Sequence, residues 1–216
     1  EKQLCEENDI DYVELVLATD AVTVVINNDN DFVDHLTVEE LAQIWKADPV
    51  QTWSEIRDEW PDEEIVLYGP AETSGTYDWF NENVIGEDTK HTTEYQPTEE
   101  DETIVRGIRD NEGGMGYFGY AYYNSNPDLV KALEVDGGDG CTEPNLDNAK
   151  DGSYPMARPL FIYANEQSLQ REEVYEYVEF YLENAETDAV KDIGYVPSST
   201  DLRDSNLEKL DEMAGN

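Results

Sequence analysis

Two hydroxyl side chains flank a glycine in the segment AETSGTYDWF (residues 71–80), directly ahead of a run with helical spacing. The first backbone N–H groups of a helix lack partners within the helix and lie at the positive end of its dipole. An anion placed there accepts several hydrogen bonds at once. Ser74 and Thr76 would add hydroxyl donors, and Gly75 has no Cβ to keep an oxyanion away from the backbone. The triplet predicts a small-anion site, although helix capping alone is the more common use of such residues.

The neighbouring elements would place this triplet at the edge of a sheet. Residues 64–69 (EIVLYG) have the composition of a buried strand, which a Gly-Pro pair should end. Beyond the triplet, Tyr77, Phe80 and Val84 recur at helical spacing, and Gly86 supplies a C-terminal stop. Ligands of open α/β sheets bind at the carboxyl ends of strands, which is where the triplet falls.

Strand and helix signals alternate along the rest of the chain. Thr37 and Glu40 form a capping box, so a helix should begin at residue 38. Further strands are expected at 12–17, 21–27, 113–123 and 158–165, with Asp20 in a turn between the first two. Further helices are expected at 99–110 after a Thr98 cap, after Pro127, at 171–184 and near 205–214, with the longest loop at 136–153. This alternation predicts an α/β fold with largely parallel sheets.

Acidic residues dominate the 216-residue chain, which has 52 Asp and Glu against 13 Lys and Arg and a formal net charge of −39. The carboxylates are dispersed and accompany 38% hydrophobic residues, which favours a folded chain over a disordered one. Such a surface suits molar salt, where the Debye length falls to about 3 Å. We therefore expect an extremely halophilic, haloarchaeal source. Nucleic acid is not expected as a partner, because little positive charge is available to neutralise phosphates.

The sequence gives little support to other kinds of site. His35 and His91 are isolated, which predicts solvated or loop histidines and no metal site. No G-x-S-x-G elbow surrounds Ser74, so a serine hydrolase is not expected, and neither an enzyme nor a cofactor is indicated. Cys5 and Cys141 could form a disulfide or remain two free thiols. No stretch is apolar and long enough to span a bilayer, and the opening EKQLCEEN suggests a piece cut from a longer precursor.

Four segments resemble the phosphate-binding proteins of ABC importers in order and spacing. They are VLYGPAETSGTYDWF (66–80), TEEDETIVRGIRDNEGGMGYFGYAYY (98–123), YPMARPLFIYAN (154–165) and IGYVPSS (193–199). The resemblance implies a two-lobed type II periplasmic binding-protein fold that closes on phosphate and delivers it to the membrane subunits of an ABC permease. It also implies a place outside the cytoplasm, at the cell surface, where a lipid anchor on the precursor could hold the protein. Residues 1–26 would belong to lobe I, 27–157 to lobe II and 158–216 to the return into lobe I.

The same resemblance implies that the triplet at 74–76 contacts phosphate oxygens. Two positions depart from the family pattern, since Pro70 stands where well-studied members have an arginine and Thr73 where many have an acidic residue. Thr73 stays among the expected ligand contacts, and Glu72, one residue earlier, could replace the acid. Arg158 could supply the arginine contact with the oxyanion, or it could form a structural ion pair between the lobes.

Nothing ahead of Glu1 corresponds to the strand and hydroxyl-bearing loop with which the family's first lobe begins. We therefore expect an incomplete first lobe, half of the binding cleft, and weak or no phosphate binding by this chain alone. Two alternatives remain open. One is a degenerate binding-protein lobe used in protein–protein interaction or sensing. The other is a receptor for a different oxyanion, such as sulfate, molybdate or tungstate.

Overall fold

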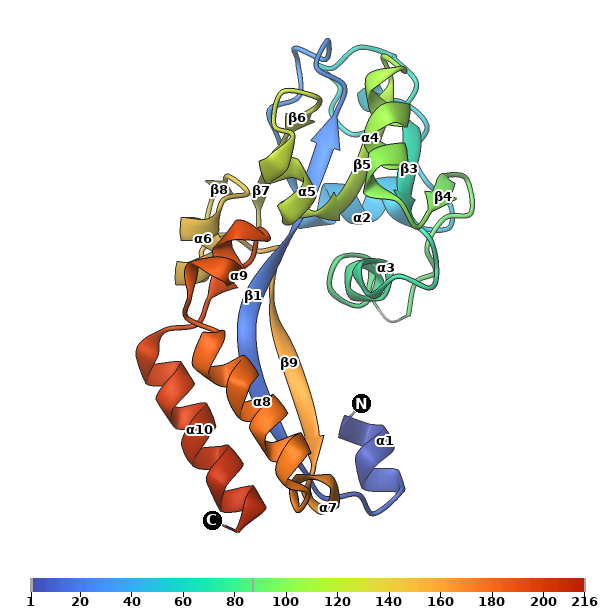
Figure 1. The fold of residues 1–216 in the computed structure, drawn as a ribbon. Coiled ribbons are helices and arrows are strands. Elements are labelled where there is room, and N and C mark those ends of the chain that lie inside the picture. Colours follow the sequence, from blue (N-terminus) through green and yellow to red (C-terminus); the bar gives the residue numbers. More distant parts are fainter. Residues whose placement is uncertain (1, 87, 216) are drawn as a thin grey trace. The chain divides into compact units, whose positions relative to one another are not determined.

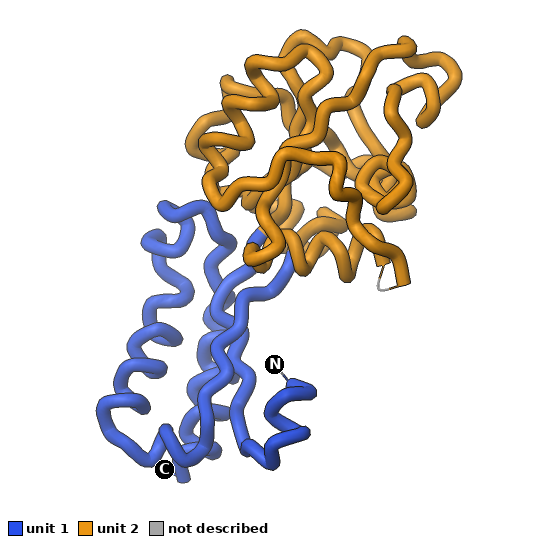
Figure 2. Tube along the Cα trace, turned by 90° about the vertical axis from the view of Figure 1, so that its right-hand side faces the viewer, with its two compact units in different colours: residues 1–20, 158–216 blue, residues 21–157 orange. Residues whose placement is uncertain are grey.

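The computed structural model describes residues 2–86 and 88–215 and divides the chain into two compact units. Unit 1 consists of Glu1–Asp20 and Arg158–Asn216, and unit 2 of Ala21–Ala157 (Figure 2). The first boundary therefore falls between Asp20 and Ala21, whereas the sequence interpretation placed it at residue 26. The chain enters unit 2 in the middle of a strand, so no turn or linker in the sequence marks the position.

That strand is β1 (Tyr12–Ile26), a single element where two strands and a turn were expected. Asp20, expected in the turn, lies within the strand and is buried. An acidic side chain usually ends a buried strand, but here Arg158 neutralises it. The partner is far away in the chain, so the local pattern gave no sign of it.

Unit 2 is built on a mixed sheet in which the second part of β1 runs antiparallel to β5 (Gly114–Gly119). Strand β5 is parallel to β3 (Val66–Pro70), and β3 is parallel to β4 (Gln96–Thr98). The sheet is therefore mixed, not largely parallel. Strand β6 (Lys131–Ala132) also pairs with β1, and a second, small sheet consists of β2 (His35–Thr37), β7 (Glu134–Asp136) and β8 (Cys141–Thr142). The helices of unit 2 are α2 (Val38–Trp45), α3 (Gly75–Phe80), α4 (Asp101–Arg109), α5 (Tyr120–Ser125) and α6 (Leu146–Asp151). A short 3-10 helix lies at Trp53–Glu55 and a π-helical turn at Asn81–Ile85.

Unit 1 contains the first part of β1, paired with β9 (Ala157–Asn165) and with β10 (Val196–Pro197). Its helices are α1 (Lys2–Glu7), α7 (Glu166–Leu169), α8 (Glu172–Asn184), α9 (Asp188–Asp192) and α10 (Thr200–Ala214). Helices α8 and α10 lie along one side of the β1–β9 ribbon (Figure 1). The core between them consists of buried apolar side chains, namely Val13, Leu15, Ala164, Leu169, Val178, Leu182 and Leu210.

Local helix signals were mostly correct, and the exceptions have tertiary causes. The capping box of Thr37 and Glu40 starts α2 as expected. Thr98 does not cap α4, because it still belongs to β4, and Glu100 takes the cap position. The helix expected to begin at Pro127 does not form. The chain there forms a turn and then β6, whose Ala132 pairs with Val25 of β1.

Three further boundaries differ from the sequence prediction. The strand expected at 113–123 ends at Gly119, where α5 begins. The loop expected at 136–153 contains β8 and α6. The last helix begins at Thr200, capped by Ser199, and so is longer than the expected 205–214.

Close approach of strands β3 and β5 requires a glycine at position 116. Gly116 lies opposite Tyr68, and a Cβ on it would lie 2.3 Å from the Tyr68 carbonyl oxygen. We expect Gly116→Ala to lower the free energy of unfolding by about 1–3 kcal/mol, because the strands must separate. Denaturant unfolding would measure this. Gly119→Ala, at the end of the same strand with no atom within 4 Å of the added Cβ, is the matched control and should have little effect. Equal stability losses for the two variants would contradict the explanation.

Candidate ligand-binding site

The turn between β3 and α3 places the Ser-Gly-Thr triplet at the carboxyl end of a strand, as expected. Ser74 is the N-cap of α3, and its Oγ accepts a hydrogen bond from the Thr76 N–H at 3.2 Å. The Ser74 N–H donates to the Ala71 carbonyl at 2.9 Å. The capping role is therefore real. Two of the N–H groups that were expected to be free already have partners.

The triplet is open to solvent. Gly75 is exposed, and Ser74 and Thr76 are half-buried. A Cβ added to Gly75 would meet no atom within 4 Å, so a small molecule could approach the backbone there. The Ser74 hydroxyl accepts one hydrogen bond and still has its own proton to donate.

Two carboxylates lie next to the triplet. The Thr73 hydroxyl donates a hydrogen bond to Glu99 Oε1, and both residues are exposed. Parallel pairing of β3 and β4, with Pro70 opposite Thr98, brings together the two turns that carry them. Glu72, also exposed, is in the same turn as Thr73. The sequence prediction placed Glu99 only at the start of the helix expected at 99–110. Its position after a neighbouring strand of the same sheet was the signal that could have identified it.

Arg158 belongs to unit 1 and forms an ion pair with Asp20. Its Nε and Nη2 lie 2.9 and 2.8 Å from Asp20 Oδ2. The two side chains are only 15% and 5% exposed. Of the two roles considered for Arg158, the structure contains the ion pair, and both partners come from unit 1.

Cysteines and possible metal ligands are the remaining sequence candidates. Cys5 in α1 and Cys141 in β8 are free thiols. Among residues 2–86 and 88–215, no group of three or more His, Cys, Asp or Glu side chains could hold a metal ion. In the same part of the chain, no helix is both long and apolar enough to cross a membrane.

His91 lies outside the helices and strands, as a loop histidine would, but it is buried and not solvated. Its Nδ1 lies 2.7 Å from the Thr92 carbonyl oxygen and must carry the proton, because a carbonyl only accepts. Its Nε2, 3.2 Å from the Tyr117 hydroxyl, then accepts from that group. Rings of Tyr77 and Tyr95 each lie 4.8 Å from the imidazole. This cluster anchors the site, because the Tyr95 hydroxyl also donates to the carbonyl of Pro70, just before the turn.

The buried imidazole makes stability depend on pH. Burial lowers the pKa of His91 below its ordinary value of 6.5, and outweighs the opposite effects of the Thr92 carbonyl and Glu72. As the pH falls below 6.5, the unfolded chain binds a proton that the folded chain excludes, so this contribution to stability is complete above pH 6.5 and is lost on acidification. For each pH unit below 6.5, the free energy of unfolding of the wild type should fall by up to about 1.4 kcal/mol more than that of His91→Phe. Denaturant unfolding at pH 7.5 and 5.5 would measure the difference. The same change in the free energy of unfolding for both proteins between these pH values would contradict the explanation.

Comparisons with known proteins agree on one family. The family model described as PBP superfamily domain matches residues 1–185. The chain is 42% identical over 202 residues to Protein SphX of Synechocystis. The aligned region covers 91% of this chain and 60% of that protein. It is 38% identical over 212 residues to the phosphate-binding protein PstS of Staphylococcus haemolyticus, covering 97% of this chain and 66% of that one. The chain thus spans 60% to 66% of these curated relatives.

A solved structure extends the similarity to three dimensions. The crystal structure of a possible phosphate binding protein from Planctomyces limnophilus superimposes with a TM-score of 0.84 at 38% identity. The match covers 98% of this chain and 76% of that protein. The fold is therefore common to this chain and to a protein of similar sequence.

Proposed function

Since the chain belongs to the PBP superfamily, we propose that it is an extracytoplasmic solute-binding protein that binds inorganic phosphate and delivers it to an ABC transporter. The observation that carries the proposal is the solvent-accessible Ser74-Gly75-Thr76 triplet at the start of a helix, in a chain similar to proteins named for phosphate binding. In this role the protein catalyses no reaction. Binding of the ligand, and the conformational change that accompanies it, is the signal to the permease.

In the proposed site, short-range neutral donors hold the anion. The Ser74 hydroxyl, the Thr76 hydroxyl and the backbone at Gly75 would donate to phosphate oxygens, with Thr73 beside them. Direct hydrogen bonds act over short distances, so molar salt weakens them much less than it weakens interactions with distant charges. A net charge of −39 therefore does not prevent local anion binding in molar salt. We leave Arg158 out of this ligand set because its guanidinium is paired with Asp20, and its contact with the anion stays a prediction.

The carboxylates near the turn favour an anion that still carries a proton. Glu72 and Glu99 are exposed beside Thr73. A carboxylate accepts a hydrogen bond from the P–OH group of hydrogen phosphate but repels a fully ionised sulfate. We therefore propose phosphate over sulfate as the ligand.

Calorimetry of the complete protein in molar potassium chloride tests the proposal. Phosphate should bind saturably, and sulfate and molybdate at least about tenfold more weakly, on the scale of one hydrogen bond to a charged group. Tighter binding of sulfate or molybdate would assign the site to another oxyanion. Saturable binding of none of the three would overturn the receptor proposal.

The alternative of a degenerate lobe that binds other proteins rests on one observation. Pro70 occupies the position where the sequence comparison led us to expect an arginine, and it lies within β3. No arginine can then reach the anion from this position. The absence of any anion binding in the calorimetry would favour this alternative.

The proposal also places the protein at the cell surface of a halophile. The dispersed excess of carboxylates, 52 against 13 basic residues, supports work in concentrated salt. A lipid anchor on the precursor would keep the protein near its permease. Surface labelling of intact cells would test this location.

A further inference from the structure

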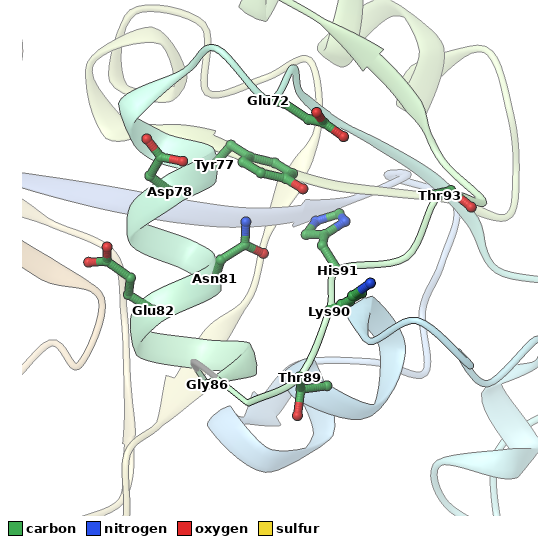
Figure 3. A pocket seen from close by; sticks show the side chains of 10 residues that line it. All are labelled: Glu72, Tyr77, Asp78, Asn81, Glu82, Gly86, Thr89, Lys90, His91 and Thr93. Carbon is green, nitrogen blue, oxygen red and sulfur yellow. The ribbon is translucent and has the colours of Figure 1, made fainter.

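One side chain of unit 2 packs against both ends of the turn that carries the Ser-Gly-Thr triplet. The imidazole of His91 lies 4.8 Å from the Tyr77 ring and also 4.8 Å from the Tyr95 ring. Tyr77 directly follows Thr76, and its ring lies beside the imidazole in Figure 3. The Tyr95 hydroxyl donates to the carbonyl of Pro70, the last residue before the turn, at 3.1 Å. His91 therefore lies between the side chain that fixes the start of the turn and the one that follows its end.

Further contacts of the turn come from the segment that begins at Tyr95. The Ala71 N–H donates to the Thr98 carbonyl at 3.1 Å, and the Thr73 hydroxyl donates to Glu99. A displacement of Tyr95 would shift these partners as well. Binding groups must be held within about 0.5 Å of their productive positions. The triplet therefore depends on Tyr95 and on the imidazole packed against it.

The place of His91 suits only the neutral imidazole. Nδ1 carries the proton donated to the Thr92 carbonyl, and Nε2 accepts from the Tyr117 hydroxyl. Within the described part of the chain, Nε2 is the acceptor that this hydroxyl has, and Tyr117 is fully buried. A proton on Nε2 would leave the hydroxyl without an acceptor, and a buried donor in that state is costly. A protonated His91 must therefore move out of the cluster.

The groups around the imidazole do not compensate for a positive charge at that position. The rings packed on it are uncharged at acidic and neutral pH, namely Trp45, Tyr77, Tyr95 and Tyr117. Its backbone pairs with that of Lys46. The charged side chains that line the adjoining cavity are Glu72, Asp78, Glu82 and Lys90. Burial lowers the pKa of His91 more than the Thr92 carbonyl and Glu72 raise it.

We propose that protonation of His91 withdraws support from the turn at 70–77 and thereby weakens phosphate binding at residues 74–76. The inference rests on the phosphate site proposed above and adds its regulation by acid. His91 is a positioning residue in this scheme, because it acts through Tyr77 and Tyr95. The neutral form, which supports binding, prevails above the lowered pKa of the folded protein, and the support is lost as the pH falls through that value. Phosphate affinity should then fall by up to about tenfold for each further pH unit.

Calorimetry of phosphate binding to the complete protein in molar potassium chloride, between pH 7.5 and 4.5, tests the proposal. The comparison is His91→Phe, which keeps a ring between Tyr77 and Tyr95 but cannot take up a proton. The two proteins should bind phosphate about equally at pH 7.5, and the wild type at least about tenfold more weakly than the variant at the acid end.

The ratio of the two affinities isolates His91, because ionisation of phosphate and of the nearby carboxylates affects both proteins. Circular dichroism would restrict the comparison to pH values at which both are folded. A ratio that does not change with pH would overturn the proposal.

Two tyrosine variants separate positioning from a general loss of stability. Tyr95→Phe removes the hydroxyl that holds Pro70 and should weaken phosphate binding severalfold at pH 7.5. Tyr120→Phe is the matched control, since it removes a similar hydrogen bond to Asn124 Oδ1, at 3.1 Å, elsewhere in unit 2. The control should leave phosphate affinity unchanged, and equal effects of the two variants would overturn the positioning role.

The ligand-free protein separates a failure of this inference from a failure of the phosphate site. Absence of phosphate binding at every pH would overturn the receptor proposal and leave the link between His91 and the turn to be decided by NMR. The backbone amides of residues 71–77 should shift on acidification of the wild type and not of His91→Phe. Amides that respond to acid alike in both proteins would overturn the role of His91.

Discussion

The Ser74→Ala, Thr76→Ala double variant of the complete protein is expected to bind phosphate about a hundredfold more weakly than wild type, or worse. Each hydroxyl would donate one hydrogen bond to a charged ligand, and such bonds contribute about 1.5–3 kcal/mol apiece. Calorimetry in molar salt would measure the change. Both side chains are half-buried at the start of α3, where the Cβ-free position of Gly75 leaves room for the anion.

The control for this experiment must separate binding from helix capping. Ser74 also caps α3, so its loss should cost about 1 kcal/mol of stability. Ser199 caps α10 in unit 1 in the same way, accepting from the Leu202 N–H at 3.2 Å. Ser199→Ala should show a similar loss of stability with unchanged phosphate affinity. Unchanged affinity in the double variant would leave Ser74 and Thr76 with a structural role only.

Breaking the ion pair between Asp20 and Arg158 is expected to have the largest effect on stability. Arg158→Met should lower the free energy of unfolding by about 3–5 kcal/mol, because it leaves the carboxylate of Asp20, only 5% exposed, without its guanidinium partner. Adding Asp20→Leu to this variant should restore much of the loss, since an apolar pair of similar volume needs no charge compensation. Denaturant unfolding of wild type, the single variant and the double variant would measure both effects.

An exposed ion pair in the same unit provides the comparison. Arg171 and Glu173 lie 2.9 Å apart but are 64% and 69% exposed. Arg171→Ala should therefore change stability by less than about 1 kcal/mol. An effect of Arg158→Met as small as that would show that the buried pair is not structural. If phosphate affinity then fell while stability held, Arg158 would have to be returned to the ligand set.

The parts of the fold that the sequence predicted are those set by neighbouring residues. The capping box of Thr37 and Glu40 fixed the start of α2, and Gly86, with φ at +91°, ends the helical run after the triplet. The amphipathic pattern at 171–184 gave α8 to within one residue. In each case the hydrogen bond or apolar face that decides the structure is within a few residues.

The errors arose where the deciding contact is distant in the chain. Asp20 stays inside β1 because Arg158, far along the chain, neutralises it. The residues after Pro127 follow the edge of β1 instead of forming a helix, because Ala132 pairs with Val25. His91 is buried because it packs on Tyr117 of the central strand β5. Local patterns carry no trace of such partners.

The candidate site divides in the same way. The position of residues 74–76 between a strand and a helix could be predicted, because the strand, the turn and the helix follow one another directly. The contact between Thr73 and Glu99 could not, since it depends on β3 and β4 being neighbours in the sheet.

The order of residues in the two units has a consequence for protein synthesis. Unit 2 is one continuous stretch, whereas unit 1 is assembled from two segments on either side of it. On the ribosome, unit 2 can complete its core before residues 158–216 have been translated. Among the residues of this chain, the partners of Tyr12–Asp20 in β9 and β10 are translated last, so the core of unit 1 is completed after that of unit 2.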